Sequence, residues 1–128
     1  MKVAIIGSRK VFDYQLIAST LLRHVGTLDG ITIVSGGARG VDHIAATIAR
    51  RHHLSLIEHL PDYKRYGRIA PLVRNTKIVE DADIILAFPS IDAFGHLSHG
   101  TMDAVRKAYA RKKKVFVYEI IDDKIFEV

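Results

Sequence analysis

The residues that most constrain the fold are Ile31 to Ala49, which read ITIVSGGARGVDHIAATIA. The first four favour a β-strand, and the apolar residues after Gly40 recur with the spacing of one helix face. Glycines join the two patterns, and glycine adopts positive φ angles at low cost while leaving room for a ligand beside the backbone. We therefore predict a strand, a tight turn and a helix, the unit from which parallel α/β sheets are built.

The turn has the chemistry of an anion-binding site. Free N–H groups and the positive end of a helix dipole converge where a helix begins, and Arg39 adds a planar guanidinium that suits phosphate. We call Ser35–Asp42 the glycine-rich loop and predict that it binds phosphate. Its spacing fits neither a P-loop nor G-x-G-x-x-G, and the alternative is a turn that only connects two elements. Asp42 is expected to cap the helix or orient Arg39, or else to contact a ribose hydroxyl.

Strand and helix patterns alternate along the whole chain. Strands are predicted at Lys2–Ile6, Ile31–Val34, Leu54–Glu58, Asp83–Phe88 and Val115–Ile120, and helices at about residues 13–25, 41–49, 71–81 and 102–113, the last capped by Thr101. This alternation predicts an α/β, Rossmann-like three-layer fold, with a parallel sheet of five strands in the order 3-2-1-4-5 and helices on both faces. The tail is predicted to turn at Asp122-Asp123 and add an antiparallel edge strand. A chain of 128 residues fits a single domain, 1–128.

In such sheets, ligands bind at the carboxyl ends of the strands, near the point where the strand order reverses. The loops predicted to gather there are Gly7–Arg9, the glycine-rich loop and residues 89–101. Residues 60–70 lack apolar periodicity and interleave Tyr63 and Tyr66 with basic residues. They suit a mobile flap over a phosphate and a base, or alternatively a solvated loop.

Composition narrows the classes of function. The net charge of +5 favours anionic ligands, although much of the excess falls at Arg50-Arg51 and Arg111–Lys114, where helices are predicted to end. The absence of cysteine excludes disulfides and thiolate chemistry. No apolar run reaches membrane-spanning length and the chain starts directly with a strand, so we expect a cytoplasmic protein. The histidines lack a nearby acidic cluster, so we expect no metal site and no cofactor.

Several short motifs then point to one family. They are GSR at Gly7–Arg9, SGGARGVD at Ser35–Asp42, GR at Gly67-Arg68, PxxRN at Pro71–Asn75, DADII at Asp81–Ile85 and SHGT at Ser98–Thr101. Their order resembles the SLOG superfamily, Rossmann-like nucleotide-binding domains that include DNA-processing protein A and the lonely-guy phosphoribohydrolases. The chain is most similar to the small stand-alone members related to YspA and YpsA.

The residues and the resemblance together predict binding of a nucleotide or nucleotide-derived small molecule. The predicted ligand-binding residues are Gly7, Ser8, Arg9, Ser35, Gly36, Gly37, Ala38, Arg39, Gly40, Asp42, Arg68, Arg74, Asn75, Gly100 and Thr101.

Two relatives imply alternative functions. Lonely-guy enzymes hydrolyse the N-glycosidic bond of nucleoside 5′-monophosphates and pair as dimers, so the resemblance also implies a homodimer. Arg74 matches their arginine, but the position of their glutamate is Ala104, and Asp103 lies one residue early. Arg74 and Asp103 are therefore the catalytic candidates. DNA-processing protein A implies single-stranded DNA binding, with Tyr63 and Tyr66 as stacking candidates, and nucleic acid is the less favoured partner.

Overall fold

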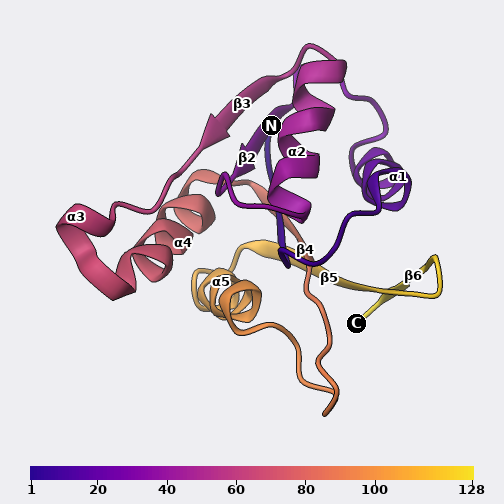
Figure 1. Cartoon of the computed structure of the whole chain (residues 1–128). Coiled ribbons are helices and arrows are strands. Elements are labelled where there is room, and N and C mark those ends of the chain that lie inside the picture. The colour runs from indigo at the N-terminus through magenta and orange to yellow at the C-terminus, as the bar shows by residue number, and fades with distance from the viewer.

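A computed structural model describes residues 1–128 as one sheet flanked by helices (Figure 1). The sheet has six strands in the order β3-β2-β1-β4-β5-β6, parallel throughout except for the antiparallel pair β5 and β6. The strands are β1 (Lys2–Gly7), β2 (Thr32–Ser35), β3 (Ser55–Glu58), β4 (Ile84–Phe88), β5 (Lys114–Ile121) and β6 (Lys124–Glu127). The helices are α1 (Tyr14–Val25), α2 (Val41–Arg51), α3 (Tyr63–Tyr66), η1 (Gly67–Ile69), α4 (Ala70–Asp81) and α5 (His99–Ala110). The predicted fold class and strand order are confirmed.

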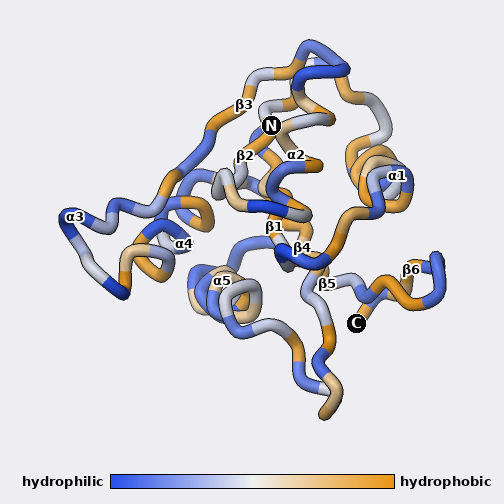
Figure 2. The backbone as a smooth tube through the Cα atoms, in the orientation of Figure 1, coloured by the Kyte–Doolittle hydropathy of each residue, from blue (hydrophilic) through white to orange (hydrophobic).

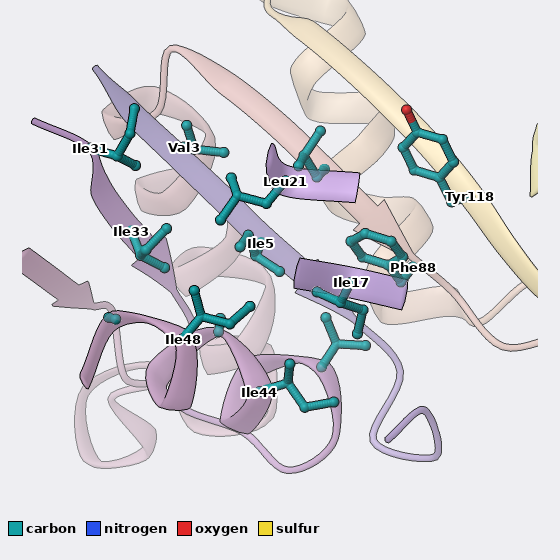
Figure 3. Packing of buried hydrophobic residues seen from close by; sticks show 14 residues of the cluster. Val3, Ile5, Ile17, Leu21, Ile31, Ile33, Ile44, Ile48, Phe88 and Tyr118 are labelled. Atoms are coloured by element: carbon teal, nitrogen blue, oxygen red, sulfur yellow. The ribbon is translucent and has the colours of Figure 1, made fainter. Parts of the chain in front are cut away.

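Helices cover both faces of the sheet, as Figure 1 shows. Helices α1 and α2 pack on one face through a buried cluster that includes Ile5, Ile17, Ile48 and Phe88 (Figure 3). Helices α4 and α5 pack on the other face through a second cluster, which includes Val105. The central strands are therefore buried on both sides, which explains why their sequences are apolar without alternation.

Local sequence signals set several boundaries. The Asp13 side chain accepts a hydrogen bond from the Leu16 N–H at 3.2 Å and caps α1. Gly26 ends this helix with a φ of 74°. Asp122 and Asp123 have φ angles of 49° and 62°, which match the twist of a tight hairpin turn between β5 and β6. The predicted antiparallel edge strand is confirmed.

Two local predictions are wrong. Residues 63–69 are not a flap or loop but form α3 and η1, leading into α4. These two short elements bury no side chain, so apolar periodicity could not reveal them (Figure 2 shows the hydrophilic stretch at α3). The second error is the cap at Thr101. Helix α5 begins at His99, because the Ser98 carbonyl accepts the Met102 N–H at 3.1 Å and Ser98 is therefore the N-cap, while Thr101 is buried in the first turn.

No helix of this protein combines the length and the apolar character needed to cross a membrane.

Candidate functional site

A cleft of about 470 Å³ opens at the carboxyl edge of the sheet, where the strand order reverses between β1 and β4. Segments that lie far apart in the sequence line it: the end of β1, the glycine-rich loop, α4, the loop after β4 and the start of α5. The predicted site residues that line it are Gly7, Ser8, Arg9, Ala38, Asp42, Arg74, Asn75, Gly100 and Thr101. The topology therefore brings most of the predicted residues together.

Glycines allow the backbone segments at this edge to approach one another. A Cβ atom on Gly40 would lie 2.3 Å from the Ser8 carbonyl oxygen, and Gly40 has a φ of 70°. The next residue, Val41, donates its N–H to the same carbonyl at 3.2 Å. A Cβ atom on Gly7 would lie 2.4 Å from the Phe88 carbonyl oxygen. These contacts hold the start of α2 against the ends of β1 and β4.

The glycine-rich loop satisfies part of its own hydrogen bonding. The Gly37 N–H donates to Ser35 Oγ at 3.4 Å, and the Ala38 N–H donates to Asp42 Oδ2 at 3.2 Å. The N–H groups of Arg39 and Gly40 have no partner within the protein. The loop therefore keeps only some of its amides free for an external anion.

Asp42 is the most unusual group in the cleft. The residue is only 5% exposed, and its Oδ1 has no hydrogen-bond partner. Burial raises the pKa of Asp42 to about 6, and the bond from Ala38 and the nearby Arg74 charge offset only part of this effect. A buried carboxylate with an unmet acceptor is costly for the fold, which is typical of functional sites.

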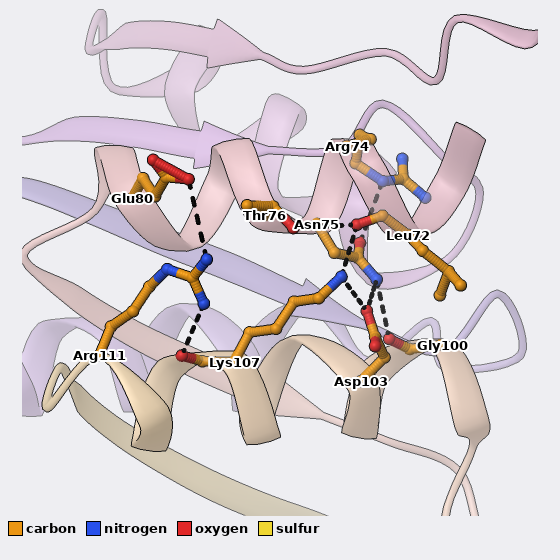
Figure 4. A network of polar contacts seen from close by, with 9 residues as sticks. All are labelled: Leu72, Arg74, Asn75, Thr76, Glu80, Gly100, Asp103, Lys107 and Arg111. Atoms are coloured by element: carbon orange, nitrogen blue, oxygen red, sulfur yellow. Dashed lines mark hydrogen bonds and ion pairs between the residues drawn. The ribbon is translucent and has the colours of Figure 1, made fainter. Parts of the chain in front are cut away.

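Arg74 ties the glycine-rich loop to both α4 and α5. Its Nη1 donates to the Gly36 carbonyl at 2.7 Å, and its Nε donates to Asn75 Oδ1 at 3.1 Å. Asn75 Nδ2 in turn donates to the Gly100 carbonyl and to Asp103 Oδ2, each at 3.1 Å (Figure 4). Burial lowers the pKa of Arg74 while the Asp42 carboxylate raises it, and a guanidinium stays charged in proteins. The network fixes the relative positions of three walls of the cleft.

The start of α5 supplies a second place for an anion. Gly100 and Thr101 lie in the first turn of this helix and line the cleft, so its positive end faces the opening. The Thr101 hydroxyl lies 3.2 Å from Ser98 Oγ, which accepts a hydrogen bond from the Ser90 N–H at 3.3 Å. The helix start is thereby attached to the end of β4.

A second cleft, of about 640 Å³, also borders the glycine-rich loop and shares Arg9 and Ala38 with the first. It is lined by Arg9, Phe12, Gly37, Ala38, Arg39, Gly40 and His43. Phe12 is 67% exposed, and sequence reasoning missed it, although an aromatic residue three positions after Arg9 in a predicted loop was an available signal. The predicted loop residues are thus divided between the two clefts, and Ala38 borders both.

Other predicted residues lie outside both clefts. Ser35 and Gly36 are the buried first residues of the glycine-rich loop, and Arg68 is exposed on η1. The Asp103 carboxylate forms an ion pair with Lys107 at 2.9 Å and accepts the bond from Asn75. As a catalytic candidate, Asp103 is therefore already engaged between α4 and α5.

Comparison with known proteins identifies similar sequences and folds. Residues 1–66 match the model of the YspA, cpYpsA-related SLOG family. The structure is similar to DNA processing protein A from Helicobacter pylori, described for its single-stranded DNA binding mode, with a TM-score of 0.68 and 26% identity over 91% of this chain and 64% of that one. It is also similar to DNA processing protein A from Streptococcus pneumoniae, with a TM-score of 0.68 and 19% identity over 91% of this chain and 49% of that one. No curated protein sequence matches the chain.

Proposed function

The chain belongs to the YspA, cpYpsA-related SLOG family, and from this premise we propose that its 470 Å³ cleft binds a nucleotide or a nucleotide-derived small molecule. The observation that carries the proposal is the meeting of the α5 start, the Arg9 and Arg74 guanidinium groups and the buried Asp42 carboxylate in that cleft. Nucleotides combine an anionic phosphate with neutral hydrogen-bonding groups, and the cleft offers cations and an acceptor to match them. Its size lies within the usual range of small-molecule sites.

In this proposal the phosphate lies at the start of α5, near Gly100 and Thr101, and Arg9 is the cation of the cleft wall that would pair with it. The reason is electrostatic. Within the glycine-rich loop, the Ala38 amide already binds the Asp42 carboxylate, which repels a second anion at that point. The loop contributes Ala38 and Asp42 to the wall of the cleft, while Arg39 and the Gly40 amide face the second cleft and would hold a further anionic group.

Isothermal titration calorimetry with AMP, GMP, CMP and UMP tests the proposal. We expect at least one nucleotide to bind well below millimolar, and Arg9→Ala to weaken it by roughly tenfold, as for loss of a charge-assisted hydrogen bond. Arg68→Ala is the matched control, because it removes the same charge outside both clefts. The proposal would be contradicted if all four nucleotides bound with a Kd above millimolar. It would also be contradicted if Arg9→Ala and Arg68→Ala lost the same amount of affinity.

The second cleft supports single-stranded DNA binding as a second candidate function. Arg9, Arg39 and His43 line this cleft together with the exposed Phe12, which is the combination of basic groove and stacking surface that unpaired bases need. The similarity to the Helicobacter pylori protein adds to this candidate. Fluorescence anisotropy with a labelled oligo(dT) should show affinity that falls steeply with salt and that Phe12→Ala reduces. No binding at low salt would remove this candidate.

A further inference from the structure

We infer that Asp42 selects the ligand by accepting a hydrogen bond from a ribose hydroxyl, so that the cleft discriminates ribonucleotides from their dideoxy analogues. The inference rests on the proposed nucleotide-binding function. It adds that the ribose of the nucleotide lies at the wall of the cleft that holds Asp42. Its basis is a buried acceptor that the fold leaves without a donor, namely Asp42 Oδ1.

The two oxygens of this carboxylate are in different situations. Oδ2 accepts the Ala38 N–H at 3.2 Å, whereas Oδ1 has no partner in the protein. Asp42 lines the cleft, and the torsion that turns a carboxyl group about its Cβ–Cγ bond is soft. Oδ1 itself is buried, so a ligand donor would reach it once this torsion has turned the carboxyl group towards the cleft.

Arg74 places a complementary donor beside this acceptor. A Cβ atom on Gly36 would lie 2.5 Å from Arg74 Nη1 and 2.9 Å from Asp42 Oδ2, so both groups lie against the same backbone position. Arg74 Nη1 and Nε are bonded to the Gly36 carbonyl and Asn75, which leaves Nη2 as the nitrogen without a protein partner. The guanidinium with this open donor and the carboxylate with the open acceptor therefore belong to the same part of the cleft wall.

A ribose diol meets both requirements, because each hydroxyl donates one hydrogen bond and accepts others. A phosphate at neutral pH only accepts and would be repelled by the carboxylate. Guanine commonly presents two adjacent N–H groups to both oxygens of a carboxylate, but Oδ2 is already occupied by Ala38. Exocyclic amino groups of adenine and cytosine also donate, but the sugar is directly bonded to the phosphate, so with the phosphate at the start of α5 we assign the sugar to Asp42.

Calorimetry with AMP and GMP against 2′,3′-dideoxy-AMP and 2′,3′-dideoxy-GMP tests this inference. For the wild-type protein we expect the ribonucleotide to bind roughly tenfold or more tightly, the typical effect of a hydrogen bond to a charged group. In Asp42→Ala the ratio of the dideoxy Kd to the ribonucleotide Kd should fall several-fold, leaving only the part that Arg74 supplies. Asp42→Asn keeps an oxygen for the Ala38 N–H, so it should fold normally and still lose most of the preference. Asp29→Asn, at an exposed position outside the clefts, should leave the ratio unchanged.

The outcomes separate this inference from the function on which it rests. Nucleotides that bind with equal affinity in the ribo and dideoxy forms would overturn the role of Asp42 and leave nucleotide binding intact. A preference that is undiminished in both Asp42 variants would also overturn it, because another group would then read the hydroxyls. Absence of binding by all four probes would remove the proposed function and the inference together.

Discussion

Arg74 Nη1 donates a hydrogen bond of 2.7 Å to the backbone carbonyl of Gly36, 38 positions away in the sequence. The bond joins α4 to the glycine-rich loop at the edge of the sheet where the cleft opens. The same guanidinium also holds Asn75, which contacts the start of α5. One side chain therefore positions three segments of the cleft, so its loss should affect both stability and ligand binding.

Arg74→Lys should destabilise the protein and weaken nucleotide binding even though it keeps the charge. A lysine ammonium cannot reproduce the planar fork that bonds the Gly36 carbonyl and Asn75 together. We expect the free energy of unfolding to fall by about 1 to 3 kcal/mol, the cost of leaving a partly buried polar group unpaired. Urea unfolding measures this, with the exposed Arg68→Lys as the control. Equal stability of the two variants would contradict the role of Arg74.

Asp42→Asn should stabilise the protein at alkaline pH. The pKa of Asp42 is raised from 3.8 to about 6 in the folded state, so the fold binds this proton more tightly than the unfolded chain does. Wild-type stability should therefore rise as the pH falls from above 6 towards 4, and the cost of the charged form applies above 6. The shift in pKa corresponds to about 3 kcal/mol. At pH 8 the free energy of unfolding of Asp42→Asn should therefore exceed that of the wild-type protein by up to this amount.

Urea unfolding at several pH values measures the effect. The advantage of Asp42→Asn should shrink as the pH approaches 4, where the wild-type carboxyl is protonated in the folded state but still partly ionised in the unfolded chain. The charged neighbours of Asp42, namely Arg74, Glu58 and Arg9, are unchanged in the variant. A variant less stable than wild type at pH 8 would mean that the carboxylate stabilises the fold and is not retained for a ligand.

Gly40→Ala should destabilise the protein far more than Gly26→Ala. Both glycines have positive φ angles, 70° and 74°, so both substitutions strain the backbone. Only at Gly40 would the new methyl group meet backbone, 2.3 Å from the Ser8 oxygen, whereas nothing lies within 4 Å at Gly26. Overpacking typically adds about 1 to 3 kcal/mol. Thermal unfolding measures both variants. Equal decreases in the melting temperature of Gly40→Ala and Gly26→Ala would contradict the close approach of the glycine-rich loop to β1.

No free base should be released from nucleoside monophosphates. Asp103 would be the carboxylate expected to assist glycosidic cleavage, but it is bound to Asn75 and Lys107 and does not line the cleft. Chromatography of AMP after long incubation with the protein should show no adenine. Release of adenine that Arg74→Ala abolishes would instead support the phosphoribohydrolase alternative.

The overall fold could be predicted because its signals are local and apolar. The continuous apolar run in Ile84–Phe88 indicated a strand buried on both faces, and Asp13 and Asp122-Asp123 marked a helix start and a hairpin turn. Helix α3 could not be found by periodicity, because it buries none of its residues and depends on the Asp62 side chain, which accepts the Arg65 N–H at 3.1 Å.

The site was predicted at the level of segments but not of individual contacts. The topology rule placed Gly7–Arg9, the glycine-rich loop and Gly100-Thr101 at one edge of the sheet, where the cleft is found. Side-chain geometry decides the individual contacts. It makes Asp42 bind the Ala38 amide, and it places Arg39 in a different cleft from Arg74. Spacing along the chain does not encode such geometry directly.

An amide NMR titration of the labelled protein with AMP tests the central claim most directly, because it reports which backbone groups a nucleotide contacts. We predict saturable shifts that are largest for the amides of Gly100, Thr101, Ala38 and Asp42 in the 470 Å³ cleft, and small for Gly26 and Gly30 outside it. Shifts confined to other regions, such as the β5–β6 hairpin, or no shifts at millimolar AMP, GMP, CMP or UMP, would contradict a nucleotide site in this cleft.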